Sequence, residues 1–217
     1  STAELSIVQA RKEINLFAER IHRMFGMVND LLHTSNENEF NKLFSRIEKY
    51  ENISDSMEIE IANYLNSVSE GRLSSESKLE IRGMLREVTE IESIGDSCYN
   101  LARTISRKRQ GGMDFTEKQY EHIHQMMHLT DNALEQMIAL VEDENHVVDV
   151  NKSFNLENEI NNYRAQLKNQ NVVDVNNKEY DYQMGVHYMD LIGECEKLAD
   201  YVVNVVEAHS NVKEKKG

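Results

Sequence analysis

Two pairs of acidic residues recur at equivalent places in the sequence, and their spacing suits metal binding. Glu92 and Asp96 stand four residues apart, and Glu196 and Asp200 repeat that spacing later in the chain. On an α-helix this separation places both carboxylates on one stripe of the surface, about 40° apart around the axis. Paired carboxylates on one stripe can bind a hard cation, because such cations prefer oxygen ligands.

Each pair has a second acidic pattern upstream of it. Glu51 and Asp55 are matched in the later copy by Glu157 and Asn161. If the helices that carry these motifs are neighbours, like charges meet, and their repulsion costs stability unless a cation offsets it. The second site carries less charge, because Asn161 is an amide. The predicted metal ligands are Glu51, Asp55, Glu92 and Asp96 in the first half, and Glu157, Glu196 and Asp200 in the second.

The spacing does not choose the metal. Oxygen ligands suit iron, magnesium, manganese or calcium, and zinc also binds through carboxylates. The acids fall at the edge of the apolar arc of each helix, so we expect a groove between helices rather than a buried acid pair. A plain structural interpretation stays open, because acids on an exposed helix edge can serve only solubility in a chain with 38 of them. The protein would then be a helical adaptor.

Glu-x-x-His motifs suggest a different chemistry. Glu19 and His22 recur as Glu121 and His124, and paired motifs of this kind on two helices are typical of di-iron carboxylate proteins. The chain would then be an oxidase or an iron store. That arrangement needs ligands from four helices of one bundle, whereas these motifs fall in different halves of the chain. The sequence contains no nucleophile elbow, phosphate-binding glycine loop or zinc-type Cys/His spacing, so we expect no enzyme.

The acidic motifs belong to an internal duplication. Residues 90–102, EIESIGDSCYNLA, match residues 194–206, ECEKLADYVVNVV, with identities at the acids and the asparagine. Further matches upstream keep a nearly constant separation, which indicates two repeats of one structural unit. We place these units at residues 1–110 and 113–217, with the one glycine pair of the chain between them.

Composition predicts an all-α protein. The sequence has no proline and nine glycines in 217 residues, so little interrupts long helices. Polar breaks separate six helical stretches, three in each repeat. The predicted fold is therefore six long helices that form a duplicated pair of antiparallel three-helix bundles. The predicted breaks are 33–37, 69–75, 110–116, 142–145 and 169–177.

The third and sixth helices carry apolar stripes that should form the core. Gly95 and Ala199, each between a Glu and an Asp, are small enough to let a neighbouring helix come close. Cys98 and Cys195 fall on the stripes at positions that do not match in the duplication, so we expect buried, reduced thiols that suit a reducing cytoplasm. The stripe residues are Ile91, Ile94, Cys98, Leu101 and Ile105, then Leu191, Cys195, Leu198, Val202 and Val205.

Charge and hydropathy limit the partners. The chain has 38 acidic and 24 basic residues, and its net charge of −14 would repel a phosphate backbone, so we expect no nucleic-acid binding. The sequence shows no apolar run long enough to span a membrane and no signal-peptide pattern. It starts at Ser1 rather than methionine, as expected for a processed chain or a fragment of a longer protein.

The repeated segment resembles a family signature. IESIGDSCYNLA and CEKLADYVVNVV are similar to the E-R-I-G-D-x-x-x-N-I-A motif of PhoU proteins, and the doubled three-helix plan agrees over essentially the whole chain. The resemblance implies a regulator of phosphate uptake, with iron or zinc clusters bound on the bundle surface by the seven acids named above. Ser93 and Asn161 depart from the family pattern, which has an arginine and an acid at these places.

Within this family, residues 69–108 look closest to the cytosolic tail of bacterial sodium/phosphate cotransporters. We therefore expect a cytoplasmic domain at the inner face of the cell membrane, with the membrane domain of a phosphate transporter as partner. Inorganic phosphate bound through the metal and a second copy of the chain in a homodimer are further expected partners. The alternative is a free-standing PhoU that negatively regulates a phosphate ABC transporter and its sensor kinase.

Overall fold

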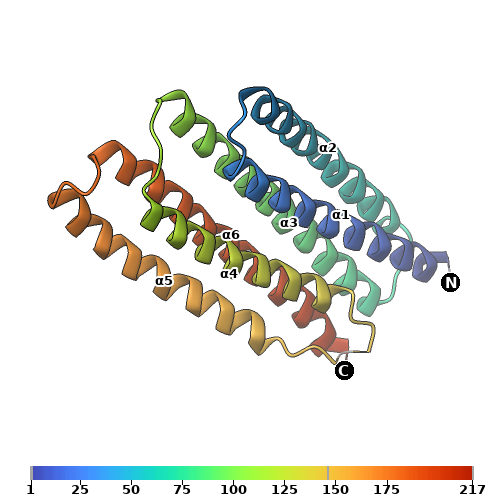
Figure 1. The fold of residues 1–217 in the computed structure, drawn as a ribbon. Helices are drawn as coiled ribbons and strands as arrows, with labels where there is room; N and C mark the ends of the chain where they lie inside the picture. The colour runs from blue at the N-terminus through green and yellow to red at the C-terminus, as the bar shows by residue number, and fades with distance from the viewer. Residues whose placement is uncertain (1, 146, 217) are drawn as a thin grey trace.

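The computed structural model describes residues 2–145 and 147–216, with side chains as far as Ser210. It is all-α, as the composition predicts, and consecutive helices run antiparallel (Figure 1). The six helices are α1 (Thr2–Leu32), α2 (Glu37–Ser69), α3 (Ser75–Gln110), α4 (Glu117–Val141), α5 (Asn151–Asn176) and α6 (Tyr182–Lys216).

Helix starts follow local capping chemistry. The Thr116 hydroxyl accepts a hydrogen bond from the Gln119 backbone N–H, and the Gln119 side chain accepts one from the Thr116 backbone N–H. This is a capping box, whose sequence signature is a threonine three residues before a glutamine. Ser74 caps α3 in the same sense, because its side chain accepts from the Ser77 backbone N–H. Gly112, in the turn between α3 and α4, has a φ of 69°, where glycine is favoured.

The predicted break at 142–145 is in the right place but too short, and the predicted break at 169–177 is misplaced. α5 begins at Asn151, later than the predicted break at 142–145 implies, and it continues through most of the predicted break at 169–177 to reach Asn176. Asparagine costs a helix only a few tenths of a kcal/mol more than the average residue. Local contacts offset that cost: Leu167 is buried, and the Asn171 amide oxygen accepts a hydrogen bond of 2.6 Å from Tyr180.

The helices form two bundles that lie side by side, α1 to α3 in one and α4 to α6 in the other. In Figure 1, α5, α4, α1 and α2 lie next to one another in that order, and α3 and α6 lie behind them. The most extensive packing between the bundles joins α3 to α6, and a second seam joins α1 to α4. The fold thus has a central pair of helices, α3 and α6, flanked by the other four.

The predicted apolar stripes lie at the centre of the structure. Every stripe residue of α3 and α6 is buried. Cys98 and Cys195 are free, buried thiols, as predicted. Burial raises the pKa of both thiols, that of Cys195 to about 12, so both remain protonated and unreactive at neutral pH.

Two matching hydrogen bonds join α3 to α6. The Asn100 amide donates to Glu194 Oε1 at 2.8 Å, and the Asn204 amide donates to Glu90 Oε2 at 3.1 Å. Glu90 and Asn100 are the counterparts of Glu194 and Asn204 in the duplication, so each repeat supplies the acceptor for the donor of the other. The bundles are therefore related by an approximate twofold axis between α3 and α6. This exchange gives a physical role to the asparagine that the two segments share.

A buried ionic cluster ties α1 to this central pair. Two guanidinium nitrogens of Arg11 lie 2.9 and 2.8 Å from the Glu87 carboxylate, whose side chain is 1% exposed, and His209 Nδ1 lies 3.3 Å from it. Burial alone would raise the pKa of Glu87, but Arg11 and His209 outweigh burial and hold that pKa below its usual value. Glu87 is therefore a charged carboxylate in the core.

No helix in the described residues is both long and apolar enough to cross a membrane.

We expect Arg11→Met to lower the free energy of unfolding by about 3 kcal/mol, because it leaves the buried Glu87 carboxylate without its main counter-charge. Urea denaturation at pH 7 measures the change. Lys12→Met, at the next and exposed position, is the matched control and should change stability by less than about 0.5 kcal/mol. Equal stability of the two variants would contradict the importance of this cluster.

The same cluster predicts how stability depends on pH. The pKa of Glu87 is lower in the folded chain than the ordinary 4.5, so its contribution is present above that pH and is lost as the pH falls through the folded value. The stability difference between wild type and Arg11→Met should therefore shrink below pH 4.5. Urea titrations at a series of acidic pH values test this, and a difference that stays constant down to acid unfolding would contradict it.

Candidate metal centre

The structure brings together four of the seven predicted ligands. Glu51 and Asp55 on α2 face Glu92 and Asp96 on α3, and one oxygen of each carboxylate lies within 4.8 Å of the others. We call these four residues the α2–α3 carboxylate cluster. Asp96 is exposed and the other three side chains are half-buried, so the cluster lies at the surface between two helices. This is the edge position that the helical pattern indicates.

Crowding alters the acidity of this cluster. Burial raises the pKa of Glu51 and Glu92 to about 9, and hydrogen bonds to Asp96 for Glu51 and to Asp55 for Glu92 add to the rise. Neighbouring negative charges act in the same direction. Both carboxyls therefore hold protons at neutral pH when no cation is bound. Four ionised carboxylates can coexist here only with a positive counter-charge.

The donor set fits a metal ion. Glu51 Oε2 is buried and has no hydrogen-bond partner, which is costly unless a ligand satisfies it. The four carboxylates offer oxygen atoms only, which suits iron, manganese, magnesium or calcium, and zinc also binds through carboxylates. Gly95 keeps the space clear, since a Cβ there would lie 3.7 Å from Glu51 Oε2 and 3.0 Å from Ile21 Cδ1. Gly95 therefore lets Ile21 of α1 and the Glu51 carboxylate come close to α3, as its small size predicts.

Glu58 is a further acid beside the cluster, and it is absent from the metal ligands predicted from the sequence. It follows Asp55 by one turn on the stripe of α2 that carries Glu51. Burial raises its pKa, and the charges of Asp55 and Asp96 raise it further. The spacing of Glu51, Asp55 and Glu58 on one helical stripe was the signal that could have found it.

Comparison with known proteins identifies the family. The PhoU domain matches residues 14–105 and 123–208, most of both three-helix bundles. The chain belongs to the PhoU family. The match occurs twice, so the duplication seen in the sequence is a pair of PhoU domains.

Solved PhoU structures share the whole fold. PhoU from Pseudomonas aeruginosa superposes with a TM-score of 0.86 over 98% of this chain and 99% of that chain, at 11% identity. The phosphate transport system regulatory protein PhoU from Streptococcus pneumoniae superposes with a TM-score of 0.81 over 98% of this chain and 97% of that chain, at 13% identity. At these identities the likeness shows the fold. No curated protein gives a significant match to the sequence.

The second PhoU repeat does not assemble the same cluster. Within the described residues, Glu157 on α5 and Glu196 and Asp200 on α6 do not converge as the α2–α3 carboxylate cluster does. Instead, Arg164 Nε lies 3.6 Å from Glu196 Oε1. Arg164 occupies the repeat position of Glu58, so equivalent places carry opposite charges.

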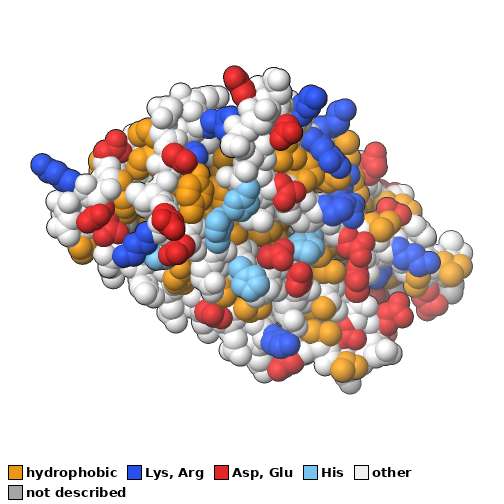
Figure 2. Space-filling view, viewed as in Figure 1, with side chains coloured by type: hydrophobic (Ala, Val, Ile, Leu, Met, Phe, Trp, Pro, Cys, Tyr) orange, Lys and Arg blue, Asp and Glu red, His pale blue; other side chains and the backbone are white. Residues whose placement is uncertain are grey.

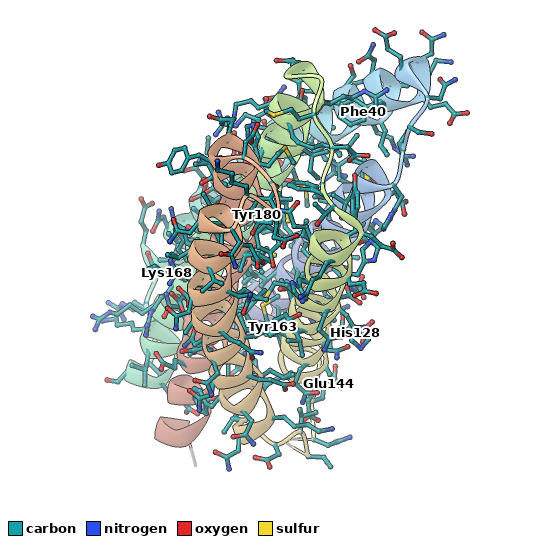
Figure 3. All side chains as sticks on the ribbon, turned by 60° about the vertical axis from the view of Figure 1, so that its left-hand side comes forward. Phe40, His128, Glu144, Tyr163, Lys168 and Tyr180 are labelled. Atoms are coloured by element: carbon teal, nitrogen blue, oxygen red, sulfur yellow. The ribbon has the colours of Figure 1, made fainter. Side chains whose placement is uncertain are left out.

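Basic residues moderate the acids of this second repeat. Burial raises the pKa of Glu196, whereas Arg164 and Lys168 lower it. Figure 3 shows α5 at the front of the view, with Lys168 on it and α4 beside it. Asn161 donates a long hydrogen bond of 3.5 Å to Glu157 Oε1. The assignment of Glu157, Glu196 and Asp200 as metal ligands therefore stays a prediction, in which Arg164 competes with the metal.

The Glu-x-x-His motifs do not meet in a di-iron centre within the described residues. The His124 ring packs against His33 at a tilt of 46°, with ring centroids 4.6 Å apart, and His22 Nε2 lies 2.7 Å from Asp131 Oδ1. Glu19 pairs with Glu142 at the end of α4. Burial and the hydrogen bond to Glu19 raise the pKa of Glu142 to about 7. The residues of each Glu-x-x-His motif thus contact other side chains, and not the equivalent motif of the other repeat.

We expect Glu51→Gln to stabilise the chelator-treated protein by about 1 kcal/mol at pH 8, because folding raises the pKa of Glu51 to about 9 whereas the unfolded chain ionises this carboxyl freely, a penalty that the amide does not have; solvent screening keeps the gain small. The same substitution should abolish most of the stabilisation that Mn²⁺ gives the wild type. Calorimetric unfolding with and without Mn²⁺ measures both effects.

Glu196→Gln is the matched control for this experiment, since it makes the same chemical change at the repeat position of Glu92. It should change the stability of the chelator-treated protein by less than about 0.5 kcal/mol, because Arg164 and Lys168 offset part of the rise that burial and Asp200 cause in the pKa of Glu196, and it should leave the effect of Mn²⁺ unchanged. Identical behaviour of Glu51→Gln and Glu196→Gln would refute the asymmetry between the repeats.

Proposed function

We propose that this chain is a regulatory protein of phosphate transport whose first repeat binds a metal cluster. The observation that carries the proposal is the convergence of four carboxylates between α2 and α3, with a buried oxygen that has no partner. The PhoU domains support the regulatory role. The likeness to a structure described as a phosphate transport system regulatory protein agrees with it. We propose no catalytic activity.

Iron or zinc is the proposed metal, held by Glu51, Asp55, Glu92 and Asp96, with Glu58 beside them. The cation would supply positive charge on a bundle surface that is otherwise acidic, which reverses the local attraction for anions. Inorganic phosphate or an acidic group of a partner protein could then bind at this place. The carboxylates position the cation, and the half-buried setting strengthens its field relative to bulk water.

The form of the regulator can also be proposed. The superposition spans nearly the full length of both PhoU structures, and this supports a free-standing regulator of a phosphate ABC transporter and its sensor kinase. It supports the tail of a sodium/phosphate cotransporter less well. In either form we propose a cytoplasmic location, a membrane transport protein as partner, and the helical surface as the contact. A second copy of the chain, in a homodimer, is a further proposed partner.

We further propose that the two repeats divide between residues 110 and 113. α3 ends at Gln110 and the chain turns at Gly112 before α4. The PhoU domain matches fall on either side of this turn.

Gene deletion and complementation test the proposal. Deletion in the source bacterium should change the rate of ³²P-phosphate uptake, and the wild-type gene should restore it. A Glu51→Gln, Asp96→Asn double variant should fail to restore it, whereas Glu196→Gln should succeed. Full restoration by a stably expressed double variant would show that regulation does not need the metal cluster.

Affinity purification from the same cells distinguishes the two forms of the regulator. A free-standing PhoU should co-purify with the ATPase subunit or sensor kinase of the phosphate ABC system. A cotransporter tail should instead be found in one polypeptide with membrane spans, which mass spectrometry of the native protein detects.

A further inference from the structure

A second group of metal-binding side chains lies on the α1–α4 seam, apart from the α2–α3 carboxylate cluster. His22 on α1 meets Asp131 and Glu135 on α4, and one ligand atom of each lies within 4.8 Å of the others. Asp131 and Glu135 are one turn apart and so lie on the same face of α4. We propose that this triad, the seam triad, binds a divalent cation of the Zn²⁺ class and thereby links the two bundles.

The chemistry of the seam triad differs from that of the carboxylate cluster. It offers one imidazole nitrogen and two carboxylate oxygens, a mixed set that zinc and its neighbours in the first transition row accept. Three protein ligands leave a coordination position for water. Two carboxylates and a neutral imidazole carry a formal charge of about −2, which a divalent cation balances.

The present contacts leave part of this charge without a partner. His22 Nε2 lies 2.7 Å from Asp131 Oδ1, so the imidazole already faces one carboxylate of the triad. Glu135 makes no ion pair with a basic side chain among the described residues. A cation seated between the three groups would satisfy Glu135 and replace a single hydrogen bond with three metal–ligand bonds.

The seam is open enough for a hydrated ion to enter. The side chains of His22 and Asp131 are 29% and 38% exposed. Figure 2 shows histidines gathered near the middle of this face, among acidic side chains. A cleft of about 590 Å³ adjoins the triad and is lined by Asp131 and His128 among other residues. An accessible path and ligands already close to one another are what a proposed metal site requires.

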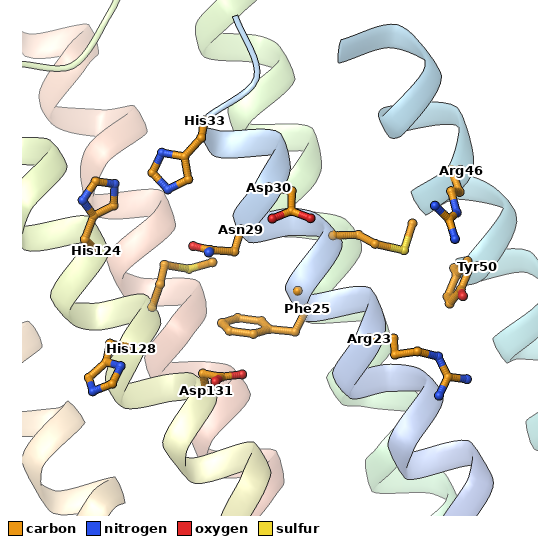
Figure 4. Close-up of a pocket in the computed structure, with 13 residues that line it drawn as sticks. Arg23, Phe25, Asn29, Asp30, His33, Arg46, Tyr50, His124, His128 and Asp131 are labelled. Carbon is orange, nitrogen blue, oxygen red and sulfur yellow. The ribbon is translucent and has the colours of Figure 1, made fainter. Parts of the chain in front are cut away.

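The arginines of the cleft do not oppose a cation in the triad. Arg23 and Arg46 also line the cleft. Figure 4 shows Arg23 on the side of α1 that faces α2, with Arg46 and Tyr50 opposite it, whereas Asp131 lies on the other side, between α4 and α1. Asp131 is thus on the opposite side of α1 from the two arginines.

Zinc titration of the full chain tests the seam triad. Isothermal titration calorimetry of the chelator-treated wild type should detect a Zn²⁺ site that His22→Gln removes or weakens by about 100-fold, since loss of a direct ligand costs at least as much as loss of an outer-shell partner. Glu135→Gln, an exposed change that does not threaten folding, should weaken the same site. His128→Gln, a histidine of α4 outside the triad, is the control and should leave the site intact.

A spectroscopic measurement identifies the ligand directly. In ¹H–¹⁵N NMR spectra of the histidine rings, one equivalent of Zn²⁺ should shift the His22 nitrogen signals and leave those of His128 in place. Unchanged His22 signals, or Zn²⁺ isotherms of His22→Gln and Glu135→Gln that match the wild type, would overturn the proposal. Glu51→Gln removes only the other metal site, so failure of the two proposals can be told apart.

Discussion

The packing of α3 against α6 is the constraint on which the rest of the structure depends. Both helices bury an apolar stripe along the shared contact, and the Asn100–Glu194 and Asn204–Glu90 hydrogen bonds fix their register. A slide of one turn, about 5.4 Å, would break both bonds at once. This register places the flanking helices, and so it sets both the α1–α4 seam and the outward edges of α3 and α6. The acidic motifs lie on those edges.

The duplication gave the two edges the same plan and different charges. In the first repeat the stripe of α2 presents Glu51, Asp55 and Glu58 to α3, and the neighbouring groups that raise the pKa values of Glu51 and Glu92 are other acids of this edge. In the second repeat an amide and Arg164 take the last two places. One repeat therefore gathers acidic side chains alone at this edge, whereas the other includes an arginine. A symmetric backbone with asymmetric charge is consistent with specialisation of the first repeat for metal binding.

Much of the fold follows from the sequence, because it depends on patterns within one helix. The absence of proline, the stripes of α3 and α6 and the capping box at Thr116 each act locally, and the structure agrees with them. The ends of α5 could not be predicted from the sequence. Contacts with Tyr180 and the core determine them, and these contacts outweigh the weak helix preference of the local residues. The convergence of Glu51 and Asp55 with Glu92 and Asp96 could be anticipated, because these motifs lie on helices that a short turn makes neighbours.

Other parts of the sites depend on contacts that no local pattern encodes. In the sequence Arg164 looks like an ordinary surface arginine, and only the packing of α5 against α6 brings it to Glu196. The partners of Glu87 come from α1 and from the far end of α6. The seam triad depends on how the two bundles are placed, whereas in the sequence His22 belongs to a Glu-x-x-His motif. The twofold relation between α3 and α6 decides which residues of the two bundles meet. The asparagine shared by the two repeats takes part in this relation, but its partner cannot be identified from the sequence.

The central claim is our proposal that metal binds at the α2–α3 carboxylate cluster in preference to the repeat-equivalent acids between α5 and α6, where Arg164 competes with it. Anomalous X-ray diffraction from crystals of the metal-loaded chain, recorded at the iron, manganese and zinc edges, tests it most directly. The account predicts a strong anomalous peak between α2 and α3, beside Glu51 and Asp96, and none beside Arg164 between α5 and α6. Peaks of equal strength in both repeats, or a peak beside Arg164 alone, would contradict it.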